Sequence, residues 1–169
     1  MKIFQKSSFL QNMSTPASQR LSSERKLWRK DHPYGFTAKP TKKPDGTLDL
    51  MNWECEIPGR ENTIWEGGVY KLRLKFDGNY PNRGPNARFV KSLFHPNVYP
   101  NGDVCLSLLD RHWKPTLTIK NILLGIQSLL TEPNPKSPAN GPAYEMYKKS
   151  RSQWEKRVKQ DVMSKHKAT

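Results

Sequence analysis

The segment from Val69 to Phe76 constrains the fold more than any other part of this chain. Its apolar residues alternate strictly with cationic ones, in the order Tyr70, Lys71, Leu72, Arg73, Leu74, Lys75 and Phe76. A period of two predicts a strand with one face buried and the other face in water. The chain must therefore contain a sheet with one covered face.

Three further strands are predicted around this one. The first opens with Phe36, Ala38 and Pro40, and a second, from Leu48 to Ile57, places Trp53, Cys55 and Ile57 on one face. Between them, Asp45 and Gly46 form a dipeptide that is typical of hairpin turns. A short strand from Ala87 to Val90 completes the set. Strands that follow one another in sequence favour an antiparallel meander.

Helical patterns flank the strands. One is predicted from about Ser18 to Lys30, with Ser18 as its cap and an inward stripe of Leu21, Arg25, Leu27 and Trp28. A core helix is predicted over 119–130 with Thr118 as its cap, and one or two helices over 143–166 place Tyr147, Trp154 and Val158 inward. The order helix, four strands, irregular loop and helices predicts an α+β fold.

The 169 residues suffice for one domain with a core that needs no disulfides, and we expect it to span 18–166 as a monomer. Residues 1–17 are expected to be a disordered N-terminal extension without a secretory h-region. The longest apolar runs fall far short of the roughly 20 residues of a membrane span. The two cysteines and four histidines show no zinc-ligand spacing, so no metal is expected.

The net charge of +14 is concentrated at the two ends of the chain. Residues 1–44 carry ten Lys and Arg against two acids, residues 144–169 carry eight against three, and the middle carries eleven against ten. Such ends suggest an acidic macromolecular partner, either nucleic acid or an acidic protein. A basic, solvated face without a specific partner is the alternative.

The irregular stretch 94–115 is where we expect the chemistry, because long ordered loops are usually functional. Cys105 follows a tight turn there and is either reactive or a buried small hydrophobe, whereas Cys55 alternates with core residues and is expected to be inert. His95 is either a base for Cys105 or a structural hydrogen-bonding residue. Asn97 is either an oxyanion donor or an ordinary turn residue.

The segment FHPNVYPNGDVCLSLL resembles the active-site segment of ubiquitin-conjugating enzymes, which carry a ubiquitin-like protein as a cysteine thioester between an activating enzyme and a ligase. The pair Tyr99-Pro100 and the segments ERKLWRKDHPYGF, LMNWECEIPG, WEGG and TIKNILLGIQ resemble its SUMO-conjugating branch. The resemblance runs from about Ser18 to at least Val158. It implies the ubiquitin-conjugating fold and a transferase that needs no cofactor of its own.

The resemblance also implies catalytic roles. Cys105 stands at the thioester cysteine, and Asn97 stands at the asparagine that stabilises the oxyanion or orders the loop. Tyr99 stands where the family positions the substrate lysine, and His95 is then structural. Ser137 stands where many members place an aspartate that helps the lysine. Its hydroxyl can accept a hydrogen bond but brings no charge.

Binding surfaces follow in the same way. Arg25, Lys26, Arg29 and His32 match the surface that binds SUMO non-covalently and meets the activating enzyme, and acidic surfaces on SUMO-like proteins suit this charge. Substrate contacts are implied for four residues: Arg88, Asp103, Pro138 and Ala139. Asn86 replaces a basic residue of the branch, and the loop 109–113 is about two residues shorter than usual. Asp103 adds a carboxylate that should disfavour a thiolate at Cys105 and weaken recognition of acidic consensus sites.

The partners implied are SUMO, its activating enzyme, SUMO ligases and lysine-bearing substrate proteins, in the nucleus and cytoplasm, with no membrane and no specific nucleic acid. Four alternatives stay open. The chain could conjugate ubiquitin or another modifier, act as a basic nucleic-acid-binding module, act as a hydrolase through Cys105 and His95, or serve as a catalytically silent scaffold. A nucleic-acid module would need aromatic residues interleaved with the basic clusters on an exposed face.

Overall fold

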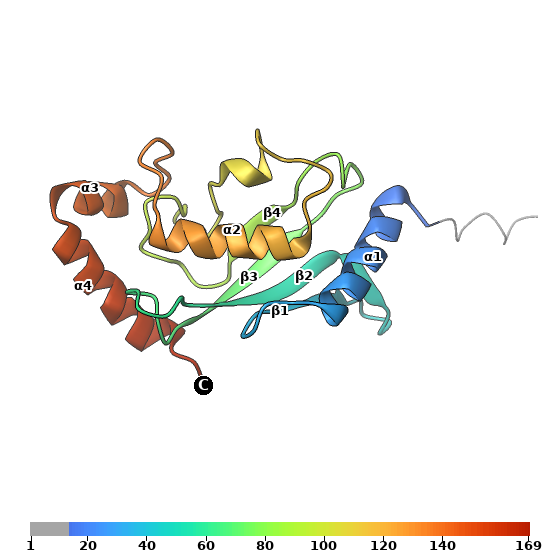
Figure 1. Ribbon diagram of the computed structural model, residues 1–169, viewed down its shortest axis with the longest axis horizontal. Helices are drawn as coiled ribbons and strands as arrows, with labels where there is room; N and C mark the ends of the chain where they lie inside the picture. Colours follow the sequence, from blue (N-terminus) through green and yellow to red (C-terminus); the bar gives the residue numbers. More distant parts are fainter. Residues whose placement is uncertain (1–13) are drawn as a thin grey trace, which may run out of the picture.

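The computed structural model describes residues 14–169, so the part of the predicted extension at 1–13 lies outside the described residues. The fold is α+β, with one helix before a four-stranded antiparallel sheet of order β1-β2-β3-β4 and the other helices after it (Figure 1). The strands are β1 (Thr37–Lys42), β2 (Leu48–Pro58), β3 (Val69–Lys75) and β4 (Asn86–Phe89). The predicted meander is confirmed.

The two sides of the sheet follow the alternation in the sequence. On β2, the side chains of Trp53, Cys55 and Ile57 are buried as predicted. On β3, the side chains of Tyr70, Leu72 and Leu74 are buried and every cationic residue is exposed. Because β2 and β3 pair without a register shift from Asn52 to Pro58, the buried side chains form one continuous apolar face.

Helix α2 (Ile119–Thr131) supplies the other half of the core. Thr118 and Asn121 form a capping box at its first turn, in which each side chain accepts a hydrogen bond from the other residue's backbone N–H. Six apolar residues of its inner face are buried: Ile119, Ile122, Leu123, Ile126, Leu129 and Leu130. The prediction for this helix is confirmed, and Figure 1 shows α2 lying across the sheet.

Helix α1 (Pro16–Lys30) begins earlier than predicted. Thr15, not Ser18, caps it by accepting a hydrogen bond from the Ser18 N–H, and Pro16 occupies the first helical position. The predicted disordered extension is therefore wrong for residues 16 and 17. The inward stripe is also different, because Leu27 is 46% exposed while Glu24 is buried.

Glu24 is buried because it joins α1 to the start of α2. Its carboxylate accepts hydrogen bonds from the Arg20 guanidinium at 3.0 and 3.1 Å and from the Ile119 N–H at 3.2 Å. Arg20 also donates to the carbonyls of Pro115 and Leu117. A carboxylate at the first turn of a helix is further stabilised by the positive end of the helix dipole.

The C-terminal part forms α3 (Gly141–Lys149), α4 (Arg151–Asp161) and a π-helical turn (Val162–His166). Trp154 and Val158 are buried as predicted, and Tyr147 packs edge-on against Trp154. Figure 1 shows α1 and the α3–α4 pair at opposite ends of the molecule. No helix in residues 14–169 is both long enough and apolar enough to cross a membrane.

Candidate active site

The loop that carries Cys105 is held against the edge of the sheet. The Phe89 N–H donates to the Gly102 carbonyl at 2.9 Å, and the Val104 N–H donates to the Ala87 carbonyl at 3.0 Å. Gly102 has a φ of +96°, and a Cβ at this position would lie 2.3 Å from the Phe89 oxygen. Only glycine therefore allows this close approach of the loop to β4.

Cys105 is the accessible thiol of the two cysteines. It is half-buried, lines a cavity of about 700 Å³, and its N–H donates to the Asn97 carbonyl at 2.9 Å. Cys55 is buried in the core, and this burial raises the pKa of its thiol to about 12. A thiolate is the reactive form of cysteine, so the environment of Cys55 makes it inert.

Asn97 is fully buried behind Cys105 and holds the 134–137 segment. Its side-chain amide donates to the carbonyls of Asn134 at 2.8 Å and Ser137 at 2.7 Å, and its Oδ1 accepts from the Asn134 N–H at 2.7 Å. The two N–H donors of the amide are both used by these bonds. In this arrangement the Asn97 side chain orders the loop. It can donate a hydrogen bond to an oxyanion only if its hydrogen bond to one of these two carbonyls breaks.

His95 is also fully buried, and both of its ring nitrogens are engaged. Nδ1 accepts from the Asn97 N–H at 3.0 Å, so Nε2 carries the proton and donates to the Leu129 carbonyl at 2.8 Å. Burial lowers the pKa of His95 to about 4. This geometry gives His95 a structural position and leaves no nitrogen free to deprotonate Cys105, which disfavours the hydrolase alternative.

The pKa of His95 predicts acid sensitivity. The folded state keeps the ring neutral, whereas the unfolded chain binds a proton near the usual pKa of 6.5. The free energy of unfolding is therefore undiminished by this group above about pH 6.5 and falls as the pH drops toward 4, by up to roughly 3 kcal/mol. Urea denaturation at several pH values across this range should show the fall in the free energy of unfolding with decreasing pH.

A His95→Gln variant is the control for this slope. Because glutamine does not titrate, the fall in the free energy of unfolding with acid should be smaller than in the parent protein. His166 keeps a contribution of the same sign, since burial also lowers its pKa. Equal slopes in the parent and the variant would contradict the assignment to His95.

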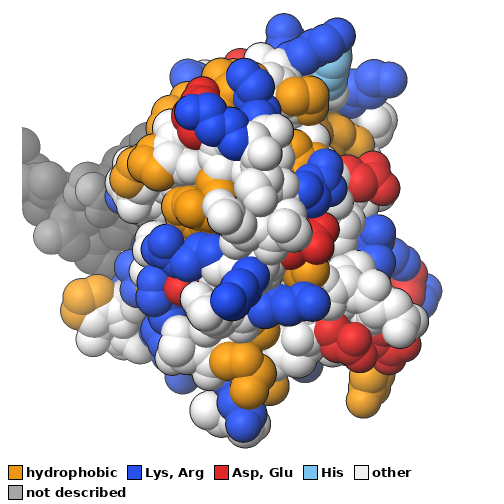
Figure 2. Space-filling view, turned by 90° about the vertical axis from the view of Figure 1, so that its left-hand side faces the viewer, with side chains coloured by type: hydrophobic (Ala, Val, Ile, Leu, Met, Phe, Trp, Pro, Cys, Tyr) orange, Lys and Arg blue, Asp and Glu red, His pale blue; other side chains and the backbone are white. Residues whose placement is uncertain are grey.

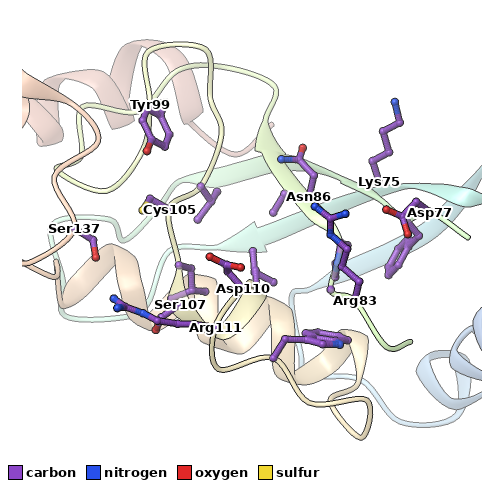
Figure 3. Close-up of a pocket in the computed structure, with 18 of the residues that line it drawn as sticks. Lys75, Asp77, Arg83, Asn86, Tyr99, Cys105, Ser107, Asp110, Arg111 and Ser137 are labelled. Carbon is purple, nitrogen blue, oxygen red and sulfur yellow. The ribbon is translucent and has the colours of Figure 1, made fainter. Parts of the chain in front are cut away.

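The cavity beside Cys105 has two ends, one at the thiol and one lined by charged side chains. Tyr99 and Ser137 lie next to Cys105 at the first end, and Lys75, Asp77 and Arg83 line the other (Figure 3). The Ser137 hydroxyl accepts a hydrogen bond from the Asn134 side chain at 3.3 Å. Three predicted site residues, Cys105, Tyr99 and Ser137, are thus brought together around one space.

Several charged residues of this cavity were not predicted. Lys75, Arg83 and Arg111 supply positive charge, and Asp77 and Asp110 supply negative charge. The alternation of β3 indicated only that Lys75 faces water. Arg83 and Arg111 come from separate irregular segments, so no local pattern could have placed them in one cavity.

Arg88 and Asp103 form a pair outside the cavity lining. Arg88 donates through Nε at 2.7 Å and through a terminal nitrogen at 3.2 Å to the two carboxylate oxygens of Asp103, and Asn101 donates to Asp103 as well. The Arg88 hydrogen bonds lower the pKa of Asp103. The charge of Asp103 is therefore compensated by Arg88, so the expected effect of a free carboxylate on the Cys105 thiol does not follow.

The remaining predicted residues lie elsewhere on the surface. Arg25 is half-buried, whereas Lys26, Arg29 and His32 are exposed on or just after α1. The His32 ring stacks on Trp28, and its Nδ1 lies 2.8 Å from the Trp28 carbonyl oxygen. Two other predicted residues, Pro138 and Ala139, follow Ser137 in the chain but do not line the cavity, whereas Asn86 does.

Within residues 14–169, no three His, Cys, Asp or Glu side chains are arranged to hold a metal ion. Cys105, held by the hydrogen-bonded loop around it, supplies a candidate nucleophile. A thiol in an open cavity can accept an acyl group from a partner's thioester, which releases the partner's thiol. An amine that enters the same cavity can then attack the new thioester and release the Cys105 thiol.

Comparisons with known proteins agree with this geometry. The model of the ubiquitin-conjugating enzyme family matches residues 20–162. The chain is 56% identical over 153 residues to the SUMO-conjugating enzyme UBC9 of Caenorhabditis elegans, covering 89% of this chain and 92% of the relative. It is 52% identical over 149 residues to the SUMO-conjugating enzyme ubc9 of Dictyostelium discoideum, covering 87% and 94%. The chain therefore belongs to the ubiquitin-conjugating enzyme family, in the branch of these SUMO-conjugating relatives.

Proposed function

We propose that this chain accepts SUMO from its activating enzyme as a thioester on Cys105 and transfers it to substrate lysines. The observation that carries the proposal is the half-buried Cys105 in an open cavity beside Tyr99 and Ser137. The proposal is also supported by the sequence identity of more than 50% between this chain and two SUMO-conjugating enzymes, over most of the chain.

The proposed reaction has two acyl-transfer steps. First, the Cys105 thiol loses its proton, its sulfur attacks the carbonyl carbon of the thioester on the activating enzyme, and that enzyme's sulfur leaves as a thiolate that takes up a proton. Second, a neutral lysine amine attacks the new thioester, the C–S bond breaks, an isopeptide bond forms, and the amine proton passes to solvent or to the departing sulfur. A free lysine has a pKa of about 10.4, so the site must present the amine without its proton.

Charging with SUMO tests the proposal. The protein is incubated with SUMO-activating enzyme, ATP and SUMO, and we expect an adduct that a thiol reductant removes. Peptide mapping of the adduct should place SUMO on Cys105. No adduct, or an adduct that resists the reductant in the unmutated protein, would overturn the thioester proposal.

The basic surface of α1 is proposed to bind SUMO and the activating enzyme. Arg25 and Lys26 have no acidic partner within 4.0 Å among residues 14–169, so their charge is available to an acidic surface. We predict that Arg25→Glu with Lys26→Glu weakens non-covalent SUMO binding by about ten-fold or more and slows charging, because charge complementarity becomes repulsion.

A matched variant controls for net charge. Lys156→Glu with Lys159→Glu makes the same charge change on exposed positions of α4. Titration calorimetry with SUMO should show near-normal binding for this variant, while circular dichroism checks that both proteins are folded. Unchanged SUMO binding by the α1 variant would refute the role of this surface.

Asp103 is proposed to lower the preference for acidic target sites. The guanidinium of Arg88 is held by Asp103, so it is less available to an acidic residue near the target lysine. We predict that Asp103→Asn raises SUMO transfer to peptides with such a residue by about two- to five-fold, the effect of an exposed ion pair. Transfer to a neutral peptide and an Asp45→Asn variant, at the exposed turn between β1 and β2, are the controls, and an equal gain in either would contradict the assignment.

A further inference from the structure

A second cavity, separate from the catalytic one, lies between the sheet and the C-terminal segment. It has a volume of about 240 Å³ and shares no lining residue with the cavity at Cys105. Its charged lining comes from β2, β3, the segment after β4 and the residues that follow α4: Glu56, Lys71, Lys91, Lys165, His166 and Lys167. Four of these are lysines and one is an acid, so the cavity is strongly basic.

Most of this positive charge is not neutralised. Lys71 and Lys167 have no acidic partner within 4.0 Å among residues 14–169, whereas Lys165 lies 3.4 Å from Asp161. Lys91 donates one hydrogen bond, at 3.0 Å, to the carbonyl of Lys165. Since an ammonium group has three N–H donors, two donors of Lys91 are left for another acceptor.

His166 provides an independent indication of a ligand. It is only 5% exposed, its ring packs on Tyr70 with a centroid distance of 5.1 Å, and its Nε2 has no hydrogen-bond partner among the described residues. Buried polar atoms are nearly always paired in folded proteins, so an unpaired one calls for an explanation. The protonated ring of His166, which carries a proton on both nitrogens, would pair Nε2 with an oxygen acceptor in the adjoining cavity.

The walls of the cavity are held in place by backbone contacts. Gly68 and Lys167 pair as in an antiparallel sheet, and the Ala168 N–H donates to the Gly67 carbonyl at 3.2 Å. The lysines after α4 are therefore fixed beside those of the sheet. Figure 2 shows Lys and Arg side chains spread over the end of the molecule that carries α3 and α4, with Asp and Glu side chains among them.

We propose that this cavity binds a phosphate group, with Lys71, Lys91 and Lys167 as its cationic contacts and the protonated ring of His166 as a donor through Nε2. Phosphate oxygens accept several charge-assisted hydrogen bonds at once, which matches a cluster of ammonium groups. The volume lies below the roughly 300–1,000 Å³ of sites for drug-sized ligands, so it suits a phosphate or pyrophosphate rather than a nucleotide. The proposed site gives a role to Lys165 and Lys167, which belong to the excess of positive charge at the C-terminal end of the chain.

Titration calorimetry with sodium pyrophosphate tests the proposal on the full chain. We expect saturable binding to one site, weakened about ten-fold or more by Lys91→Gln with Lys167→Gln, since each removes a charge-assisted hydrogen bond. Lys156→Gln with Lys159→Gln removes the same charge from exposed positions of α4 and should leave binding nearly unchanged. Absent saturation, or equal weakening by both pairs, would overturn the proposal.

Two further measurements refine the test. The pKa of His166 is lowered by burial and by the charges of Lys91 and Lys165, so a bound anion should raise it, as followed by NMR of the ring. No change of this pKa at saturating pyrophosphate would exclude His166 from the site. A phosphoserine peptide is titrated in parallel, and tighter binding of the peptide would identify a phosphorylated protein, rather than the free anion, as the source of the phosphate.

Discussion

A Cys105→Ala variant is expected to form no thiol-sensitive adduct with SUMO and to transfer no SUMO to lysine. Among residues 14–169, Cys105 is the only sulfur-bearing residue that lines this cavity, so the variant removes the thiol that would form the thioester. Gel electrophoresis with and without reductant measures the adduct. A Cys105→Ser variant should instead retain an ester adduct that resists the reductant, because its hydroxyl replaces the thiol.

Cys55→Ala is the matched control for this loss. It removes the other cysteine, whose thiol is buried and has a pKa raised to about 12. We expect normal charging from this variant once its fold is verified by circular dichroism. Charging of Cys105→Ala, or loss of charging in folded Cys55→Ala, would contradict the assignment of Cys105 as the nucleophile.

Replacement of Asn97 by alanine is expected to slow SUMO transfer from Cys105 to lysine by about 100- to 1,000-fold. The variant loses two hydrogen bonds to the carbonyls of Asn134 and Ser137 and one from the Asn134 N–H. It also loses any amide that could turn toward the oxyanion, and the loss of one such donor has this magnitude in other enzymes. Single-turnover discharge of the preloaded enzyme measures the rate.

Hydrogen exchange separates the two roles of Asn97. If it acts by ordering the loop, the Asn134 amide should exchange faster in Asn97→Ala than in the parent protein. Asn79→Ala removes an exposed asparagine whose side chain is outside the site, and it should change neither exchange nor rate. Unchanged discharge from a folded Asn97→Ala protein would refute both roles.

Regular patterns in the sequence predicted the central fold well. The alternation from Tyr70 to Phe76 and the helical period from Ile119 to Leu130 both depend on burial along one face, which is a local property of the sequence. The structure buries the predicted residues in each case. The Asp45-Gly46 turn likewise joins β1 to β2, as its local chemistry predicted.

Helix α1 shows where local patterns fail. Its start was misplaced because Ser18 is a good cap, yet Thr15 followed by Pro16 provides the start that the structure uses. Its inward face was misread because a carboxylate is seldom buried alone. The partners that stabilise Glu24 include the Ile119 N–H, which lies 95 residues away and has no signal near Glu24.

The site shows the same limit. Resemblance to a family selected Cys105, Tyr99 and Ser137, and the structure brings them together around one cavity. The Arg88–Asp103 ion pair was not predicted, although each residue was selected alone, because the pair depends on how the loop docks on β4. The basic cavity at His166 depends on contacts between β3 and the last residues described, which no local pattern reveals.

The most direct test of the account is the choice of modifier. The protein is incubated with ATP and SUMO in the presence of SUMO-activating enzyme, and separately with ATP and ubiquitin in the presence of ubiquitin-activating enzyme, and intact masses are recorded by mass spectrometry. We predict one SUMO per protein chain, lost on treatment with reductant, and no ubiquitin adduct. A ubiquitin adduct without a SUMO adduct would contradict the proposed function.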